Sequence, residues 1–185
     1  MSLTSRKILR NKSLIYRACH KVYRDFWEAP KRERIRKRVL ALKPHTISKL
    51  RDNLSIHSLI CSRDVDMLIC SQRSLYQVSE FGNTPLILHD DGSLSDQDAK
   101  LIQTKLPNAK VVLRPEADRT AEEKLANYPN ILEYRKNQVM ALKLVDVKIW
   151  AKGTRTLYVD SDIAFFSPPN ELIESSKASE NGNFF

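Results

Sequence analysis

The sequence predicts an α/β fold in which a Rossmann-like, mostly parallel sheet has helices on both faces and follows a basic helical extension. After residue 52, short apolar segments of strand length alternate with segments whose apolar residues recur at helical spacing. The strand-like segments are apolar throughout, which is typical of a parallel sheet covered on both sides. Before residue 53, Lys and Arg dominate. We therefore expect two regions, residues 1–52 and residues 53–185.

The extension holds the excess positive charge of the chain. The 185 residues have a formal net charge of +9, yet residues 1–51 contain 16 Lys and Arg against 3 Asp and Glu, and the remainder contains 15 against 19. Apolar residues lie four apart at Leu14, Ala18, Val22 and Phe26. This spacing predicts a helix over residues 13–29, which Pro30 should interrupt before the basic run at 31–38.

Three interpretations of the extension are open. It can be a solvated basic helix or hairpin that packs through its apolar stripe. It can bind an anionic membrane surface through residues 1–51, because Phe26 and Trp27 beside basic residues suit a helix that lies in the interface. Nucleic acid is the least favoured partner, since the extension has no helix-turn-helix, zinc-finger or RNP signature and the rest of the sequence is acidic.

Apolar spacing and turn residues divide the second region into strands and helices. Strands are expected at residues 55–61, 86–88, 109–113 and 156–159. Helices are expected at residues 65–76, 95–106 and about 131–151, with a short one near 120–126 in an otherwise irregular segment, 115–130, and a last one from Asn170. Ser95 and Asp98 form a capping box at the start of the second of these helices, and Gly153 ends the long one.

Three Asp-x-Asp triplets are present, and they differ in their surroundings. The triplets at 64–66 and 96–98 begin predicted helices, where the helix dipole favours carboxylates. Asp160 and Asp162 instead follow an apolar strand and precede a second apolar stretch, residues 163–166, and both of these segments are expected to be buried. Two carboxylates at this spacing on extended backbone point to one face and can share a hard cation, Mn²⁺ or Mg²⁺. A salt-bridged or strand-capping pair is the alternative interpretation.

Two segments resemble the GT-A fold glycosyltransferases, which use nucleotide-diphospho-sugars. The run RTLYVDSDIAFFSPP at 155–169 is similar to the DXD strand of that family, in which YLDSD, apolar residues and a Pro are typical. The run LILHDDGS at 86–93 resembles the DDGS strand end of the same family, and the order of the segments also fits. The similarity covers roughly residues 55–175, so the second region is expected to be a nucleotide-sugar-binding domain.

The resemblance implies roles for individual residues. The ends of the first two strands would hold the base and ribose, which implies Asp90 or Asp91 and places Arg63 near the diphosphate. A simple turn that closes a strand is the alternative interpretation of the run after Asp90. No catalytic base can be assigned.

The resemblance also implies a metal site and a phosphate contact. Asp160 would reach the ribose or a metal-bound water, and Asp162 would ligate the metal directly. A basic residue on the helix before the DXD strand would face the donor phosphates or the sugar. Lys143 is the candidate for that role and Arg135 the second choice, with a solvated helix residue as the alternative interpretation of either.

The absence of long apolar runs and the pattern of cysteines indicate where the protein is located. No apolar run approaches the ~18 residues that a membrane span needs, and the first ten residues do not resemble a signal peptide. The three cysteines are odd in number and lack a C-x-x-C spacing, which indicates buried thiols in a reducing cytosol rather than zinc or disulfides. We therefore expect a cytoplasmic protein, peripheral at the inner face of a membrane if the extension binds lipid.

We accordingly expect a glycosyltransferase donor-binding region that takes a sugar from a nucleotide diphosphate, in our expectation UDP, to an unknown hydroxyl acceptor. Enzymes of the GT-A type usually continue well beyond the DXD strand, whereas this sequence ends at Phe185. The domain is therefore expected to be incomplete at its C-terminus and inactive alone. The alternative is a non-catalytic nucleotide-sugar or membrane-associated binding module in which the acidic clusters are structural.

Overall fold

The computed structural model describes residues 23–151, 153 and 155–177. It divides into two compact units, residues 1–42 and residues 43–185. Residues 43–52 group with the second unit, where the amide of His45 donates to Lys105 O at 3.1 Å and the amide of Arg51 donates to Asn83 O at 2.8 Å. Most of the helix predicted at 13–29 lies outside the described residues.

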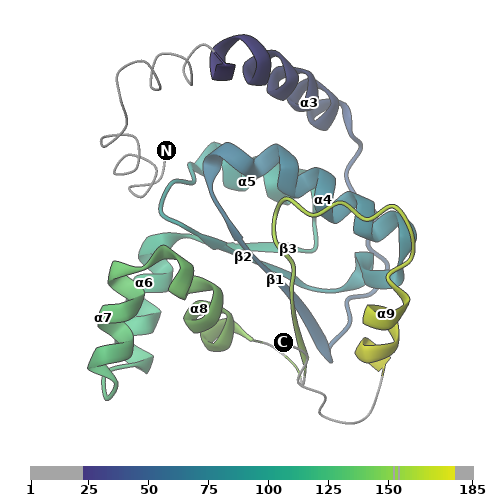
Figure 1. The fold of residues 1–185 in the computed structure, drawn as a ribbon. Helices are drawn as coiled ribbons and strands as arrows, with labels where there is room; N and C mark the ends of the chain where they lie inside the picture. Colours follow the sequence, from purple (N-terminus) through teal and green to yellow (C-terminus); the bar gives the residue numbers. More distant parts are fainter. Residues whose placement is uncertain (1–22, 152, 154, 178–185) are drawn as a thin grey trace. The chain divides into compact units, whose positions relative to one another are not determined.

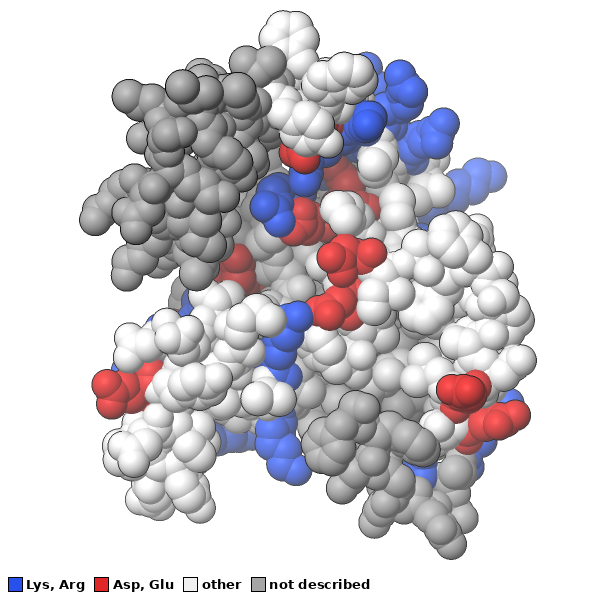
Figure 2. All heavy atoms as spheres, viewed as in Figure 1, with Lys and Arg blue, Asp and Glu red and all other residues white. Residues whose placement is uncertain are grey.

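The first unit contains a π-helical turn, η1 (Arg24–Glu28), followed directly by helix α3 (Ala29–Ala41). The expected interruption at Pro30 was wrong, because helical backbone continues from the π-helical turn into α3, with Pro30 in the first turn of α3. Phe26 and Trp27 in the π-helical turn are 75% and 63% exposed. Basic side chains gather over α3, the purple helix of Figure 1, as the space-filling view in Figure 2 shows.

The second unit is built on a four-stranded sheet that is parallel throughout. Its strands are β1 (Leu54–Ile60), β2 (Leu86–Asp90), β3 (Ala109–Val112) and β4 (Arg155–Tyr158), in the order β3-β2-β1-β4. All three pairings are parallel, and nearly every residue of β1 and β2 is buried. The predicted α/β, Rossmann-like class is therefore confirmed.

Helices cover both faces of this sheet (Figure 1). On one face lie α4 (Val65–Val78) and α5 (Asp96–Lys105); on the other lie α6 (Arg114–Lys124), α7 (Pro129–Asn137) and α8 (Leu142–Trp150). The chain crosses the sheet in one direction from β1 to β3 and in the other from β3 to β4, so right-handed crossovers place the two sets of helices on opposite faces. The remaining elements are η2 (Ser62–Asp64), η3 (Glu80–Asn83), η4 (Val139–Ala141) and α9 (Asn170–Lys177).

Two predictions about the segment between β3 and β4 were wrong. Residues 114–124, expected to be largely irregular, form α6, because Pro115 is favourable in a first turn and Ala117 and Ala121, four apart, are both buried. The long helix expected over 131–151 is split into α7, η4 and α8, since Gln138 adopts extended backbone with φ −126° and ψ 109°. The capping box of Ser95 and Asp98 is confirmed.

The sheet faces are buried against different side chains. The side chain of Ile87 packs with Val112, Ala117 and partly buried Trp150 on the face of α6 and α8. Since side chains alternate along a strand, His89 of β2 points to that same face, and Leu86 and Leu88 point to the face of α4 and α5. Both surfaces are almost fully removed from water, which stabilises each strand from two sides.

The segment after β4 differs from expectation. The apolar stretch 163–166 was predicted to be buried, but Ile163 is 42% and Phe166 94% exposed. The amide of Phe165 donates to Ser74 Oγ at 2.9 Å, so this segment runs along α4 rather than into the core. Two thiols also differ from expectation: Cys61 is partly buried, and Cys70 is exposed because it lies on the solvent side of α4; Cys19 lies outside the described residues. Within the part of the chain that the structure describes, no helix is long and apolar enough to cross a bilayer.

Candidate functional site

The carboxyl ends of all four parallel strands meet at one edge of the sheet. Chain connections leave β1 toward β2 on one side, whereas β4 lies on the other side of β1. The strand order therefore reverses between β1 and β4. In open α/β sheets, ligands bind outside the carboxyl ends at such a reversal.

Asp160 lies at this reversal and is held by two side chains. Lys143 Nζ of α8 donates to Asp160 Oδ1 at 2.5 Å, and the Tyr158 hydroxyl donates to the same oxygen at 3.2 Å. The Tyr158 hydroxyl in turn accepts from the amide of Leu59 at 3.2 Å. These contacts connect α8, β4 and the end of β1. Lys143 and Asp160, which were predicted separately for the donor site, are thus in direct contact.

The surroundings of Lys143 and Tyr158 shift the pKa values of both side chains. Burial lowers the pKa of the Lys143 ammonium, but the hydrogen bond to Asp160 and the influence of Tyr158 outweigh burial and raise that pKa above its usual value. Burial is also the largest influence on Tyr158 and raises the pKa of its phenol. At neutral pH, Lys143 is therefore a cation and Tyr158 a neutral hydrogen-bond donor.

Asp162 lies two residues further on and is exposed. The argument that Asp160 and Asp162 share one face of an extended strand was wrong, because β4 ends at Tyr158 and residues 161 and 162 form a turn. Figure 2 shows acidic and basic side chains close together near the middle of this face of the molecule.

The donor atoms near Asp160 fit a hard cation that takes most of its ligands from water and phosphate. Among the described residues, Asp160 Oδ2 and the carboxylate oxygens of Asp162 have no hydrogen-bond or ion-pair partner. No group of three or more His, Cys, Asp or Glu side chains within this described part could hold a metal. Mg²⁺ and similar ions are commonly bound by one or two carboxylates together with substrate phosphates, and these two residues could supply that set.

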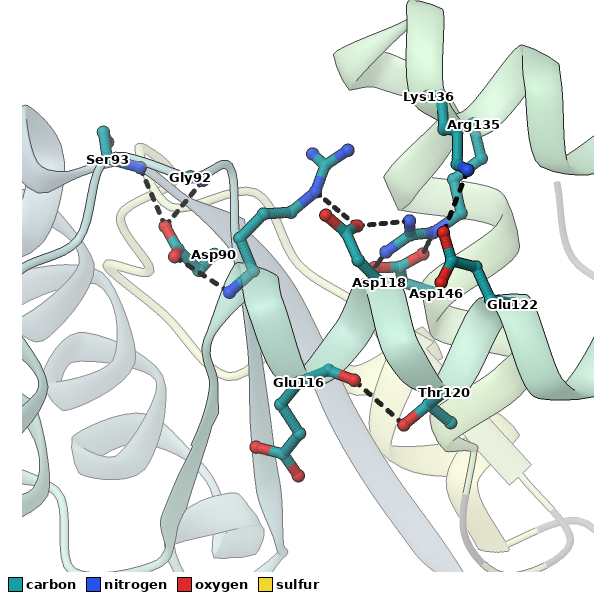
Figure 3. A network of polar contacts seen from close by, with 11 residues as sticks. Asp90, Gly92, Ser93, Glu116, Asp118, Thr120, Glu122, Arg135, Lys136 and Asp146 are labelled. Atoms are coloured by element: carbon teal, nitrogen blue, oxygen red, sulfur yellow. Dashed lines mark hydrogen bonds and ion pairs between the residues drawn. The ribbon is translucent and has the colours of Figure 1, made fainter.

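Asp90, at the end of β2, organises the loop that follows it (Figure 3). Its Oδ1 accepts from the amides of Gly92, Ser93 and Leu94 at 2.8–3.0 Å, and its Oδ2 accepts from the amide of Arg114 at 3.0 Å. These contacts use most of its hydrogen-bonding capacity. Asp91 is less buried, and its Oδ1 accepts from the Ser93 hydroxyl at 2.5 Å. Asp91 is therefore the more accessible of the two carboxylates predicted for the nucleotide.

Arg63 lies in η2, directly after β1. Its side chain is 59% exposed, and the guanidinium donates to both oxygens of Asp64 at 2.8 and 2.9 Å. The amide of neighbouring Ser62 donates to Ser93 Oγ at 2.9 Å, which connects this turn to the loop after β2. Arg63, Asp90 and Asp91 thus share one part of the carboxyl edge, on the far side of β1 from Asp160.

Arg135, the second choice for the phosphate contact, is fully buried. Its guanidinium donates to both oxygens of Asp146 at 2.5 and 2.9 Å and to Asp118 at 2.6 Å, as Figure 3 shows. Arg114 Nε donates to the same Asp118 oxygen at 2.7 Å. A buried arginine with these partners is structural, so Lys143 remains the candidate of the two for the phosphate contact.

Two features were not predicted from the sequence. Tyr158 could have been found, because it lies two residues before Asp160 and so on the same side of a strand. A cavity of about 350 Å³ lies at the opposite edge of the sheet, among residues that include Leu54, Leu86 and Lys110. It includes none of the residues predicted for the site.

No protein-family model matches this chain, and no curated protein matches it in sequence.

Proposed function

We propose that this chain is the donor-binding region of a glycosyltransferase, which transfers a sugar from a nucleotide diphosphate, UDP in our proposal, to a hydroxyl acceptor. The observation that carries the proposal is the contact between Lys143 and Asp160 at the strand reversal. A cation and carboxylates gathered there suit a ligand that combines a divalent metal with a diphosphate. The resemblance of the DXD and DDGS segments supports the same class of donor.

In this proposal, different residues contact different parts of the donor. Asp160 and Asp162 would hold Mn²⁺ or Mg²⁺, and Lys143 would contact the phosphates or the sugar. Asp91 would contact the ribose or base from the other side of β1, with Arg63 near the diphosphate. A bound cation would supply a positive charge that stabilises the diphosphate leaving group.

The transfer breaks the bond between the sugar C1 and the diphosphate oxygen, and the electron pair of that bond stays on the diphosphate. A bond forms between C1 and the acceptor oxygen, whose proton must leave to a base. We assign none of the described residues as the base that takes this proton. For the chain by itself we therefore propose binding of the donor, and not the transfer reaction.

The alternative is a non-catalytic nucleotide-sugar or membrane-associated module. It predicts a folded chain whose acidic clusters act only in the structure, as Asp90 does in its loop. Binding of UDP that requires both Mn²⁺ and Asp162 distinguishes the two proposals.

The test is a thermal melt of the whole chain with UDP, with MnCl₂ and with both. We expect an increase in Tm only with the pair, and we expect Asp162→Asn to remove that increase without changing the melt in buffer. Asp96→Asn is a matched control, because Asp96 belongs to an Asp-x-Asp triplet that begins helix α5. A wild-type melt that responds to none of the additions would overturn the metal-dependent donor site.

We further propose that the first unit attaches the protein to an anionic membrane surface, which would place it at the inner face of a cytoplasmic membrane. The exposed rings of Phe26 and Trp27 precede a helix with six Lys and Arg and one Glu. Aromatic rings can enter the headgroup region while the basic residues contact anionic lipids.

A further inference from the structure

We propose that Lys143 couples metal binding to diphosphate binding. Its ammonium competes with a divalent cation for Asp160, and this competition ends when a diphosphate binds the ammonium instead. This inference rests on the proposed donor site. It adds that the metal and the diphosphate bind tightly to that site only when both are present.

The geometry places the ammonium where a cation would bind. Lys143 Nζ lies 2.5 Å from Asp160 Oδ1, and the Tyr158 hydroxyl holds the same oxygen from a second direction. The carboxylate is therefore already neutralised by a positive charge. A divalent cation that approaches Asp160 meets repulsion from this ammonium, or must displace it.

The lysine is able to leave. The side chains of Lys143 and Asp160 are 26% and 46% exposed, so neither is enclosed by packing. Lysine carries its charge on a flexible four-carbon stem and donates hydrogen bonds in several directions. Tyr158 remains behind to orient Asp160, since its hydroxyl is anchored by the amide of Leu59.

A diphosphate resolves the competition, because its oxygens can bind the displaced ammonium and the metal at once. Metal and diphosphate then increase each other's affinity, and thermodynamic linkage requires this increase to be equal in both directions. A nucleoside without phosphates offers no partner for the ammonium. Uridine should therefore leave the affinity for Mn²⁺ unchanged, whereas UDP should raise it.

The experiment measures Mn²⁺ affinity of the whole chain by water-proton relaxation, with no nucleotide, with uridine and with UDP. For Lys143→Gln we expect Mn²⁺ alone to bind about fivefold more tightly, the gain that a partly exposed ion pair of this kind supports. We also expect UDP to raise the Mn²⁺ affinity of this variant less than it raises that of the wild type. Lys143→Met serves as a second variant that removes the charge.

Lys148→Gln is the matched control, since Lys148 is an exposed lysine on the same helix and its loss changes the net charge equally. It should bind Mn²⁺ like the wild type. If the wild type shows UDP-dependent Mn²⁺ binding but neither Lys143 variant changes the affinity for Mn²⁺ alone, the competition is overturned and the donor site stands. If the wild type shows no coupling between Mn²⁺ and UDP, both proposals fail.

Discussion

Nδ1 of His57 lies 2.9 Å from Nε2 of His89, so two neighbouring strands share a histidine–histidine hydrogen bond inside the protein. Both side chains are almost completely buried, and Ser55 Oγ lies 3.0 Å from the other nitrogen of His57. Only one proton can occupy the shared hydrogen bond. A charge on either ring would be buried away from water, so both rings are neutral in the folded protein at pH 7.

We predict that this pair makes the protein sensitive to acid. Burial, followed by the neighbouring His89, lowers the pKa of His57 to about 3; burial, followed by Arg135, lowers the pKa of His89 to about 4. In the unfolded chain both titrate near 6.5. As pH falls from 6.5 toward 4, the unfolded state binds protons that the folded state does not, so the free energy of unfolding should decrease by up to about 1.4 kcal/mol per pH unit for each histidine.

The measurement is urea unfolding between pH 7 and pH 5. In His57→Asn and His89→Asn the dependence on pH should be shallower, because each removes one titrating ring. A wild-type unfolding free energy that stays constant over this range would contradict the prediction.

Arg135 should be important for stability rather than for ligand binding. Arg135→Met leaves the buried carboxylate of Asp146 without its two hydrogen bonds, and we expect a loss of about 3–5 kcal/mol in the free energy of unfolding at pH 7. Lys136→Gln is the control, since Lys136 is exposed and forms an ion pair with Glu122 at the surface. Its effect should stay within about 0.5 kcal/mol. Equal stability of the two variants in urea unfolding would show that the buried pair has no structural role.

Two glycines with positive φ should respond differently to substitution. Gly92 has φ +98°, and a Cβ there would lie 3.6 Å from Cγ of Arg114, so Gly92→Ala should cost only the conformational penalty of about 1–2 kcal/mol. Gly153 has φ +76°, and a Cβ there would lie 2.6 Å from the carbonyl oxygen of Asp52. Gly153→Ala must therefore also move the backbone that leads into β1. Thermal melts should show the larger decrease in Tm for Gly153→Ala, and the reverse order would be inconsistent with this packing.

The first unit should bind anionic vesicles through both its rings and its charges. We expect the full chain to sediment with vesicles of phosphatidylcholine mixed with phosphatidylglycerol and not with phosphatidylcholine alone. Neutralising Lys31, Arg34 and Arg38 together should weaken binding by roughly fivefold for each residue, since a basic residue near such a surface contributes about 1 kcal/mol. Replacing Phe26 and Trp27 with Ser should weaken binding at any salt concentration, because burial of their apolar surface is not screened.

Lys100, Lys124 and Lys148 changed together to Gln form the matched control, because they are exposed lysines of the second unit. This control should bind vesicles like the wild type. If the first-unit variants retain full vesicle binding, the membrane proposal fails. Tight binding to RNA or DNA in place of vesicles, lost with the same three basic residues, would instead favour a nucleic-acid partner.

Local sequence signals determined the class of fold and several of its parts. Apolar runs of strand length separated by helical spacing predict a parallel sheet, because period and length depend on nearby residues alone. The capping box of Ser95 and Asp98 was predictable for the same reason, since both partners lie within one helical turn. Lys143 and Asp160 were each expected near the donor from a resemblance to a family and not from spacing, and their direct contact was not predicted.

Only the tertiary structure decided how the charged residues are used. Asp90 was expected to face a nucleotide, yet its carboxylate accepts from the amide of Arg114, 24 residues away, and holds a loop. Arg135 and Lys143 are both basic residues before the DXD segment, but one is buried against Asp146 and the other reaches the carboxyl edge. The sequence by itself determined which segments become strands and helices, because those preferences are local. Which carboxylate meets which cation depends on how the helices pack across the sheet, and that packing brings together residues that are distant along the chain.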